Sequence, residues 1–162
     1  MELDKAFGLP AHALLVHAAV VLVPLAAIAL IAVGWKQAWR RQYYPPVALL
    51  AMGGAIAAFL AKQSGEPLAE SVRHAGKKVG EHPEQGDTAF VLAMVFAGAA
   101  AIVYAWETFG AKVRERFGWE WRLPVDDGVA LYIAAIPFAA LAIWAMIAAG
   151  HSGATLVWKT NR

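Results

Sequence analysis

The stretch FGLPAHALLVHAAVVLVPLAAIALIAVGW, residues 7–35, decides the fold because it carries no formal charge from one end to the other. An α-helix rises ~1.5 Å per residue, so this run is longer than the ~30 Å hydrocarbon core of a bilayer. Two histidines, His12 and His17, lie at its opening end. Ionisable side chains inside membrane spans are rare and commonly functional. The stretch therefore predicts a transmembrane helix that carries part of a site.

The composition of the whole chain predicts several such helices. Of the 162 residues, 60% are hydrophobic and 16% are charged, which is typical of a multi-span membrane protein. The chain has no cysteine, which excludes disulfides, thiolate metal sites and c-type haem and leaves His, Asp and Glu as the strong ligands. The net charge of +2 is small and no basic cluster stands out, so we expect no nucleic-acid partner.

Four uncharged runs divide the chain. They predict spans at about 9–35, 43–62, 86–106 and 128–155, separated by long polar connections at 63–85 and 107–127. The runs show no period-two alternation and are about twice the length of a barrel strand, which argues against a β-barrel. The opening residues lack the basic region of a signal peptide, so the first span is expected to stay in the mature protein. We expect an all-α integral membrane protein, a single domain of four transmembrane helices in an antiparallel bundle within the lipid bilayer.

Prolines and glycines inside the second and third runs refine this expectation. Pro45-Pro46 should open the second helix. Proline lacks a backbone N–H, and N–H groups in the first helical turn have no acceptor within the helix, so nothing is lost there. Gly53-Gly54 and Gly98 should allow close helix contacts, because lipid offers no hydrophobic drive to helix association. The chain shows no internal sequence repeat.

All five histidines fall on the same side of such a bundle. His12 and His17 open the first span, His74 and His82 lie in the connection after the second, and His151 lies towards the end of the fourth. His17 and His151 would lie ~10 Å inside the ends of neighbouring helices and form a deep pair. His12 and His82 would form a shallower pair at the rim.

Each histidine also has a purely structural interpretation. A buried His17 could hydrogen-bond a carbonyl of a neighbouring helix, and His151 could cap the C-terminus of its own helix. Placing His12 and His82 at the membrane interface would cost little free energy, because the side chains can face water there. His74, among basic residues, is expected to be solvated.

Four segments of the chain resemble a known family. They are LPAHALLVH at 9–17, SGEPLAE at 64–70, Glu81-His82, and HSGATLVW at 151–158. Together they are similar to the marks of a family of four-span bacterial membrane proteins known as domain of unknown function 2231, which typically opens with His-Pro-Leu-Leu-Val-His and ends with His-x-Gly-Gly-x-Leu-Val-Tyr. Ala13 stands here in place of the family's proline, and Trp158 in place of its tyrosine. The histidines that match the family pattern are His12, His17, His82 and His151.

The resemblance covers essentially the whole chain and implies a redox setting. Some members of the family are fused to Rieske or cytochrome c domains, so the resemblance implies a redox partner of that kind. Assembly as a homo-oligomer is compatible with it.

Haem b suits these histidines. It needs no cysteine, takes two imidazoles from different helices and prefers the apolar walls that alanine-rich spans supply. Ligation by two histidines leaves no open position on the iron and favours electron transport, as in a b-type cytochrome. His17 and His151 are the first choice of ligands and His12 with His82 the alternative, and two haems bind if both pairs form.

Two other interpretations stay open. A copper, zinc or iron ion could bind the same histidines with Glu66 or Glu70, since these ions accept mixed imidazole and carboxylate ligands. The two glutamates are four residues apart and share a helical face, although a surface helix begun by Pro67 explains them equally well. Alternatively, the chain is a cofactor-free helical subunit of a larger membrane complex.

Basic residues indicate the orientation. Lys5 alone precedes the first span, whereas Lys36, Arg40 and Arg41 follow it closely, which favours an outward N-terminus by the positive-inside rule. We therefore expect a multi-pass protein of the bacterial cytoplasmic (inner) membrane, with both termini and the histidines on the extracytoplasmic side. No nucleophile–base pair or phosphate-binding loop is recognisable, so we assign no catalytic residue and favour an electron carrier or redox subunit over a stand-alone enzyme.

Overall fold

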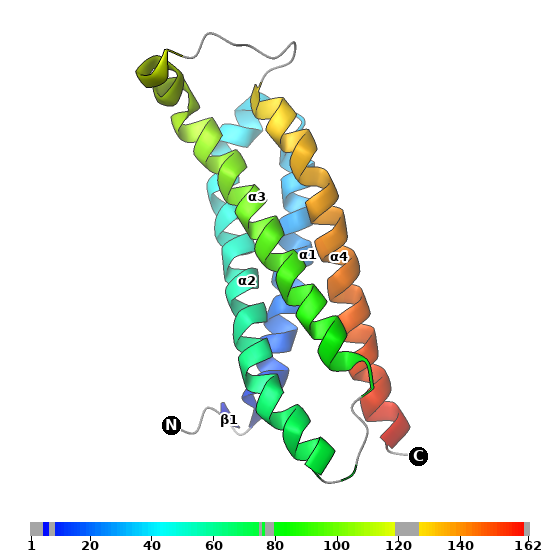
Figure 1. Cartoon of the computed structure of the whole chain (residues 1–162). Coiled ribbons are helices and arrows are strands. Elements are labelled where there is room, and N and C mark those ends of the chain that lie inside the picture. Colours follow the sequence, from blue (N-terminus) through cyan, green and yellow to red (C-terminus); the bar gives the residue numbers. More distant parts are fainter. Residues whose placement is uncertain (1–4, 7–8, 75, 77–79, 119–126, 161–162) are drawn as a thin grey trace.

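The computed structural model describes residues 5–6, 9–74, 76, 80–118 and 127–160 (Figure 1). Two short strands pair antiparallel ahead of the first helix. The elements are β1 at Lys5–Ala6, β2 at Leu9–Pro10, α1 at Ala11–Val33, α2 at Gln37–His74, α3 at His82–Phe117 and α4 at Asp127–Thr160. All four helices are long and apolar enough to cross a membrane, which confirms the expected bundle of four transmembrane helices.

The four helices run alternately up and down, so each packs against the helices before and after it in the chain (Figure 1). α4 closes the bundle against α1, whereas α1 and α3 lie diagonally opposite and make few contacts. The starts of α1 and α3 therefore meet the ends of α2 and α4. We call this the histidine end, because it contains His12 and His82, and we call the opposite one the arginine end, after Arg40.

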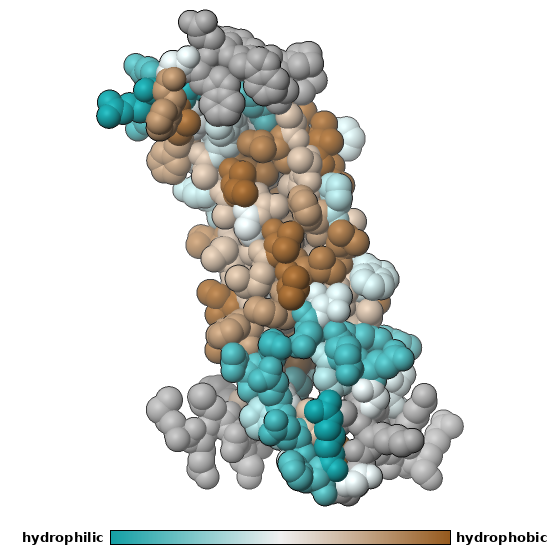
Figure 2. All heavy atoms as spheres, viewed as in Figure 1, coloured by the Kyte–Doolittle hydropathy of each residue, from teal (hydrophilic) through white to brown (hydrophobic). Residues whose placement is uncertain are grey.

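The outer face of the bundle is apolar. Figure 2 shows hydrophobic residues over the middle of one face and hydrophilic residues gathered towards the histidine end. Large apolar side chains such as Val21, Leu49 and Ile147 are more than half exposed, while the buried core consists mostly of alanine. A water-soluble bundle shows the reverse distribution. The exposed apolar side chains are therefore those that contact lipid tails.

The second helix begins earlier than the sequence predicts. The Arg40 N–H donates to the Lys36 carbonyl at 3.0 Å in its first turn, so Pro45 and Pro46 lie inside α2 rather than at its start. The connection between α1 and α2 is correspondingly short. It consists of the turn around Gly34, whose N–H donates to Leu30 O at 3.2 Å.

The predicted polar connections are largely helical. α2 continues through Pro67 to His74, so the surface helix expected from Pro67 is the final part of α2. Lys62 pairs with Glu66 one turn further along at 3.2 Å, a spacing that stabilises a solvated helix.

α3 likewise extends beyond its predicted span to Phe117. Its C-cap is Gly118, with a left-handed φ of 58° and its N–H bonded to Arg114 O. In Figure 1 the olive end of α3 turns away from the other helices. An ion pair between Arg114 and Asp127 joins the end of α3 to the start of α4. The rest of the connection expected at 107–127, residues 119–126, lies outside the described residues.

A buried ion pair holds the arginine end together. Arg40 Nε donates to Glu107 Oε1 at 2.7 Å, and the two side chains are only 3% and 8% exposed. Arg40 Nη1 also donates to the Gly34 carbonyl at 3.1 Å. The sequence places Arg40 in the connection before the second predicted span, but the early start of α2 brings it inside the bundle, where a guanidinium needs a partner. Lys36 and Arg41 remain exposed at this end.

Glycine shapes the packing at fewer positions than expected. A Cβ on Gly54 would lie 2.7 Å from a side-chain carbon of Val23 and 3.1 Å from the Val23 nitrogen, which confirms a close contact between α1 and α2. Gly53 and Gly98 have no such neighbour within 4 Å, so the close contacts expected there were wrong. Gly34 makes room instead for the ring of Tyr132.

The adjacent glycines provide a matched test of this packing. Gly54→Ala should lower the melting temperature, because the new methyl group must displace Val23 and such overpacking costs about 1–3 kcal/mol. Gly53→Ala should leave the melting temperature unchanged or raise it, since its Cβ meets open space and alanine favours a helix by up to ~1 kcal/mol. Thermal unfolding in detergent, followed by tryptophan fluorescence, measures both. Equal effects of the two substitutions would contradict the close contact at Gly54.

Candidate histidine site

His12 lies near the start of α1, half-buried against the end of α2. Its Nδ1–H donates to the Ala61 carbonyl at 2.9 Å. A carbonyl oxygen only accepts, so this bond keeps the proton on Nδ1 and leaves the lone pair of Nε2 available. The Ser64 hydroxyl lies 3.4 Å from the same Nδ1, and its proton is shared between Leu60 O at 2.9 Å and Ala61 O at 3.1 Å. A Cβ on Gly65 would come within 2.7 Å of His12 Cε1, so only glycine lets the ring lie this close to α2.

His82, the first residue of α3, is half-buried against the end of α4. Its Nδ1 lies 3.0 Å from Ser152 Oγ, and the Ser152 hydroxyl donates in turn to Ala149 O at 3.0 Å. The serine oxygen therefore accepts from His82 Nδ1–H, and Nε2 again carries the available lone pair. A Cβ on Gly153 would lie 3.0 Å from His82 Cε1, a close approach although less tight than the 2.7 Å at Gly65.

The two histidines form matching half-sites. The α1–α2 hairpin supplies His12 with Ser64-Gly65, and the α3–α4 hairpin supplies His82 with Ser152-Gly153. The two rings come from diagonally opposite helices and lie close enough to interact electrostatically. Histidines that bind metals characteristically donate one ring N–H to a neighbouring oxygen and bind through the other nitrogen. Both rings have this arrangement.

Gln85 adds an unpaired polar group beside the site. It follows His82 by about one helical turn and so shares its face of α3, the face that continues through the buried Ala89. Its Oε1 atom is buried and has no hydrogen-bond partner. Buried polar atoms are nearly always paired, so this oxygen has the capacity to accept a hydrogen bond or to bind a ligand. The sequence alone does not single out Gln85, because one glutamine in a polar segment forms no pattern that marks a binding residue.

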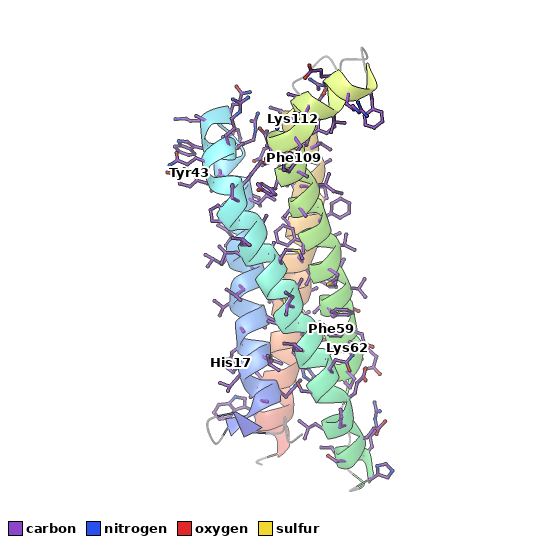
Figure 3. The ribbon with its side chains drawn as sticks, turned by 90° about the vertical axis from the view of Figure 1, so that its left-hand side faces the viewer. His17, Tyr43, Phe59, Lys62, Phe109 and Lys112 are labelled. Carbon is purple, nitrogen blue, oxygen red and sulfur yellow. The ribbon has the colours of Figure 1, made fainter. Side chains whose placement is uncertain are left out.

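The pair His17 and His151 faces outward. Both residues are exposed, and His17 Nδ1 donates to Ala13 O of its own helix at 2.6 Å. Figure 3 shows His17 on the outer side of α1, at a height close to that of Lys62. The helical period explains this, since a residue five positions after His12 is rotated by about 140° and points outward when His12 points inward. The bundle does not enclose this pair, and its role as ligands stays a prediction.

Two of the remaining candidates lie on the outer surface of α2. Glu66 and Glu70 are exposed, and Glu66 pairs with Lys62, which also bonds Asp87 on α3 at 2.5 Å. His74 is exposed as well, with its Nδ1–H donating to the Glu70 carbonyl at 2.8 Å. Among the described residues, no group of three or more His, Cys, Asp or Glu side chains could hold a metal ion. Metal binding by these histidines with Glu66 or Glu70 stays a prediction.

Comparison with known families agrees with the resemblance of the four segments. The family described as Predicted membrane protein (DUF2231) matches residues 8–161. The chain belongs to this family. The match spans all four helices of the DUF2231 protein and includes both half-sites. No match was found among curated proteins or among solved structures.

The hydroxyl that holds His82 can be removed to test the tautomer. In the DUF2231 protein, Ser152→Ala should remove the serine oxygen that accepts from His82 Nδ1–H, at a cost of about 1–3 kcal/mol, and shift the ring towards the other tautomer. Nitrogen NMR of isotope-labelled histidine rings reports the tautomer directly. Ser71→Ala is the control, because the Ser71 hydroxyl bonds only within α2, to Leu68 O. A wild-type His82 ring with its proton on Nε2 would contradict the assignment.

Proposed function

We propose that this DUF2231 protein is a membrane electron-transfer protein, a b-type cytochrome, that binds haem b between His12 and His82. The observation that carries the proposal is the matched pair of imidazoles, each with Nδ1–H bonded to an oxygen and Nε2 available. Axial haem ligation uses two neutral imidazoles in this state. Because α1 and α3 are diagonally opposite, the two rings can approach opposite faces of one flat cofactor.

The chemistry around the pair is compatible with a porphyrin. Gly65 and Gly153 present no side chains to the rings, and the core beyond them is alanine-rich. Two shallow hollows of the described surface, one beside Tyr43 and one beside Asp87, are not lined by either histidine. In this proposal haem enters as the helix ends separate at the histidine end, which requires less disruption than opening the middle of the bundle.

The residues of the site have distinct roles in this proposal. His12 and His82 would hold the haem iron through their Nε2 atoms, and the haem would supply one-electron transfer. The Ala61 carbonyl and the Ser152 hydroxyl orient the rings and raise the basicity of Nε2. The apolar core keeps water from the inner side of the site.

We further propose that the histidine end faces the extracytoplasmic side of a bacterial inner membrane. The exposed Lys36 and Arg41 lie at the arginine end, next to the first two spans, and the positive-inside rule assigns such residues to the cytoplasm. A Rieske or cytochrome c protein outside the membrane could then exchange electrons at the histidine end.

Absorption spectra of detergent-purified protein, oxidised and then reduced with dithionite, test the haem proposal. We expect the sharp reduced-minus-oxidised bands of low-spin haem in the wild type. His12→Ala and His82→Ala should each abolish them, because one remaining imidazole cannot keep the iron low-spin. His17→Ala and His151→Ala are the matched controls and should keep the bands, since both side chains face outward.

The same variants distinguish the alternatives. Loss of the bands only in His17→Ala and His151→Ala would assign the ligands to the outward pair, and partial loss in all four would indicate two haems. A wild type without haem, after expression with sufficient haem supply, would overturn the proposal.

Gln85 favours a second candidate, a single copper, zinc or iron ion bound by the same two rings. The buried and unpaired Gln85 Oε1 would add a third neutral donor to the two Nε2 atoms. Copper, zinc and iron accept imidazole and oxygen donors together. A single ion also needs far less space than a porphyrin.

Metal analysis of the same purified sample tests this candidate. Stoichiometric metal without haem bands is expected if an ion is bound, and Gln85→Leu should lower the metal affinity by at least the roughly 10–100-fold that loss of an outer-shell partner costs. Gln63→Leu, at an exposed position of α2, is the matched control and should have no effect. Equal metal affinity in both variants would exclude Gln85 as a ligand. A sample with neither haem nor metal would favour a cofactor-free subunit of a larger complex.

A further inference from the structure

A second group of buried polar side chains lies at the arginine end. The side chains of Arg40 and Glu107 are 3% and 8% exposed, and Tyr44 and Tyr132 are 2% and 6% exposed. These residues come from α2, α3 and α4, and α1 contributes the carbonyl of Ile31. All four helices therefore meet in one polar cluster, and electrostatic interactions connect Tyr44 to the other three side chains.

Three of the four side chains have clear partners. Arg40 donates to Glu107 and to the Gly34 carbonyl, and Tyr132 Oη donates to Ile31 O at 2.9 Å. The Tyr44 hydroxyl is buried and has no hydrogen-bond partner. A hydroxyl can donate one hydrogen bond and accept two, so the cluster has unused capacity at this one oxygen.

The surroundings define what can bind there. An unpaired hydroxyl away from water is costly, and inside a membrane bundle bulk water cannot supply the missing bond. Arg40 and Glu107 already form an ion pair, and burying a further charge beside it would be costly, so a free ion is a poor ligand here. All four side chains are less than a tenth exposed, so there is no opening for a large molecule. The suitable ligand is small and neutral, and both donates and accepts hydrogen bonds.

We propose that the Tyr44 hydroxyl binds an internal water molecule, which bridges it to the Arg40–Glu107 pair. Internal waters typically make about three hydrogen bonds to polar groups that otherwise lack partners, and the donors and acceptors around Tyr44 meet this need. The water completes a network to which every helix contributes. The arginine end is then a hydrated clamp that holds the four helices together, independently of any group bound at the histidine end.

Tyr44→Phe gives a result whose sign depends on the water. The substitution removes only the hydroxyl and keeps the ring. If a water is bound, the change leaves that water and the ion pair short of a partner, and we expect the melting temperature to fall by about 2–4 °C. If the hydroxyl is truly unpaired, its removal should leave the melting temperature unchanged or raise it. Tyr43→Phe, on the exposed neighbouring residue, is the matched control and should cause no shift.

A second measurement detects the water in the wild type. Radiolysis by X-ray pulses converts bound water to hydroxyl radicals, which oxidise the side chains next to it. Tyr44 should be oxidised in the intact protein in detergent, although it is buried. Met146 is equally buried in the apolar core and is more reactive, so it is the control and should stay unmodified. An unmodified Tyr44, or a Tyr44→Phe variant at least as stable as the wild type, would overturn the proposal.

Discussion

Close contact between apolar helices is the constraint on which the rest of this structure depends. Lipid tails are as apolar as the helix surfaces, so helices associate in a bilayer through tight packing of small residues and through polar contacts. The core is accordingly mostly alanine, and Gly54 lets α2 approach the backbone of α1 at Val23. Such close helices leave little space for polar side chains in the middle of the bundle. The buried polar groups of the described residues are found towards its two ends.

The buried polar groups are paired differently at the two ends of the bundle. At the arginine end, the ion pair of Arg40 and Glu107 and the bond from Tyr132 to Ile31 use donors and acceptors from all four helices. At the histidine end, His12 and His82 each use one ring nitrogen and keep the other available, and the buried oxygen of Gln85 has no partner. The arginine end is thus joined by bonds between all four helices, with only the Tyr44 hydroxyl unpaired, whereas the histidine end keeps two ring nitrogens and an amide oxygen available.

Much of the fold could be predicted because length and hydrophobicity are sufficient to define a membrane span. The four spans and their antiparallel order follow from this signal alone. The lengths of the helices do not, because a polar segment continues a helix when pairs such as Lys62–Glu66 support it. Arg40 shows the same difficulty, since its charge predicts a loop although Glu107, 67 positions away in the chain, gives it a partner inside the bundle.

The sequence by itself determined the membrane class, the number of spans, the family and the end of the bundle at which the histidines gather. Only the tertiary structure decided which histidines face the neighbouring helices and which face outward. Rotation along α1 directs His12 inward and His17 outward, and the Ser-Gly steps of α2 and α4 bring glycine against the His12 and His82 rings. Depth along a helix can be counted from the sequence. The direction in which a side chain points depends on the neighbouring helices, because their contacts set how each helix is rotated about its own axis.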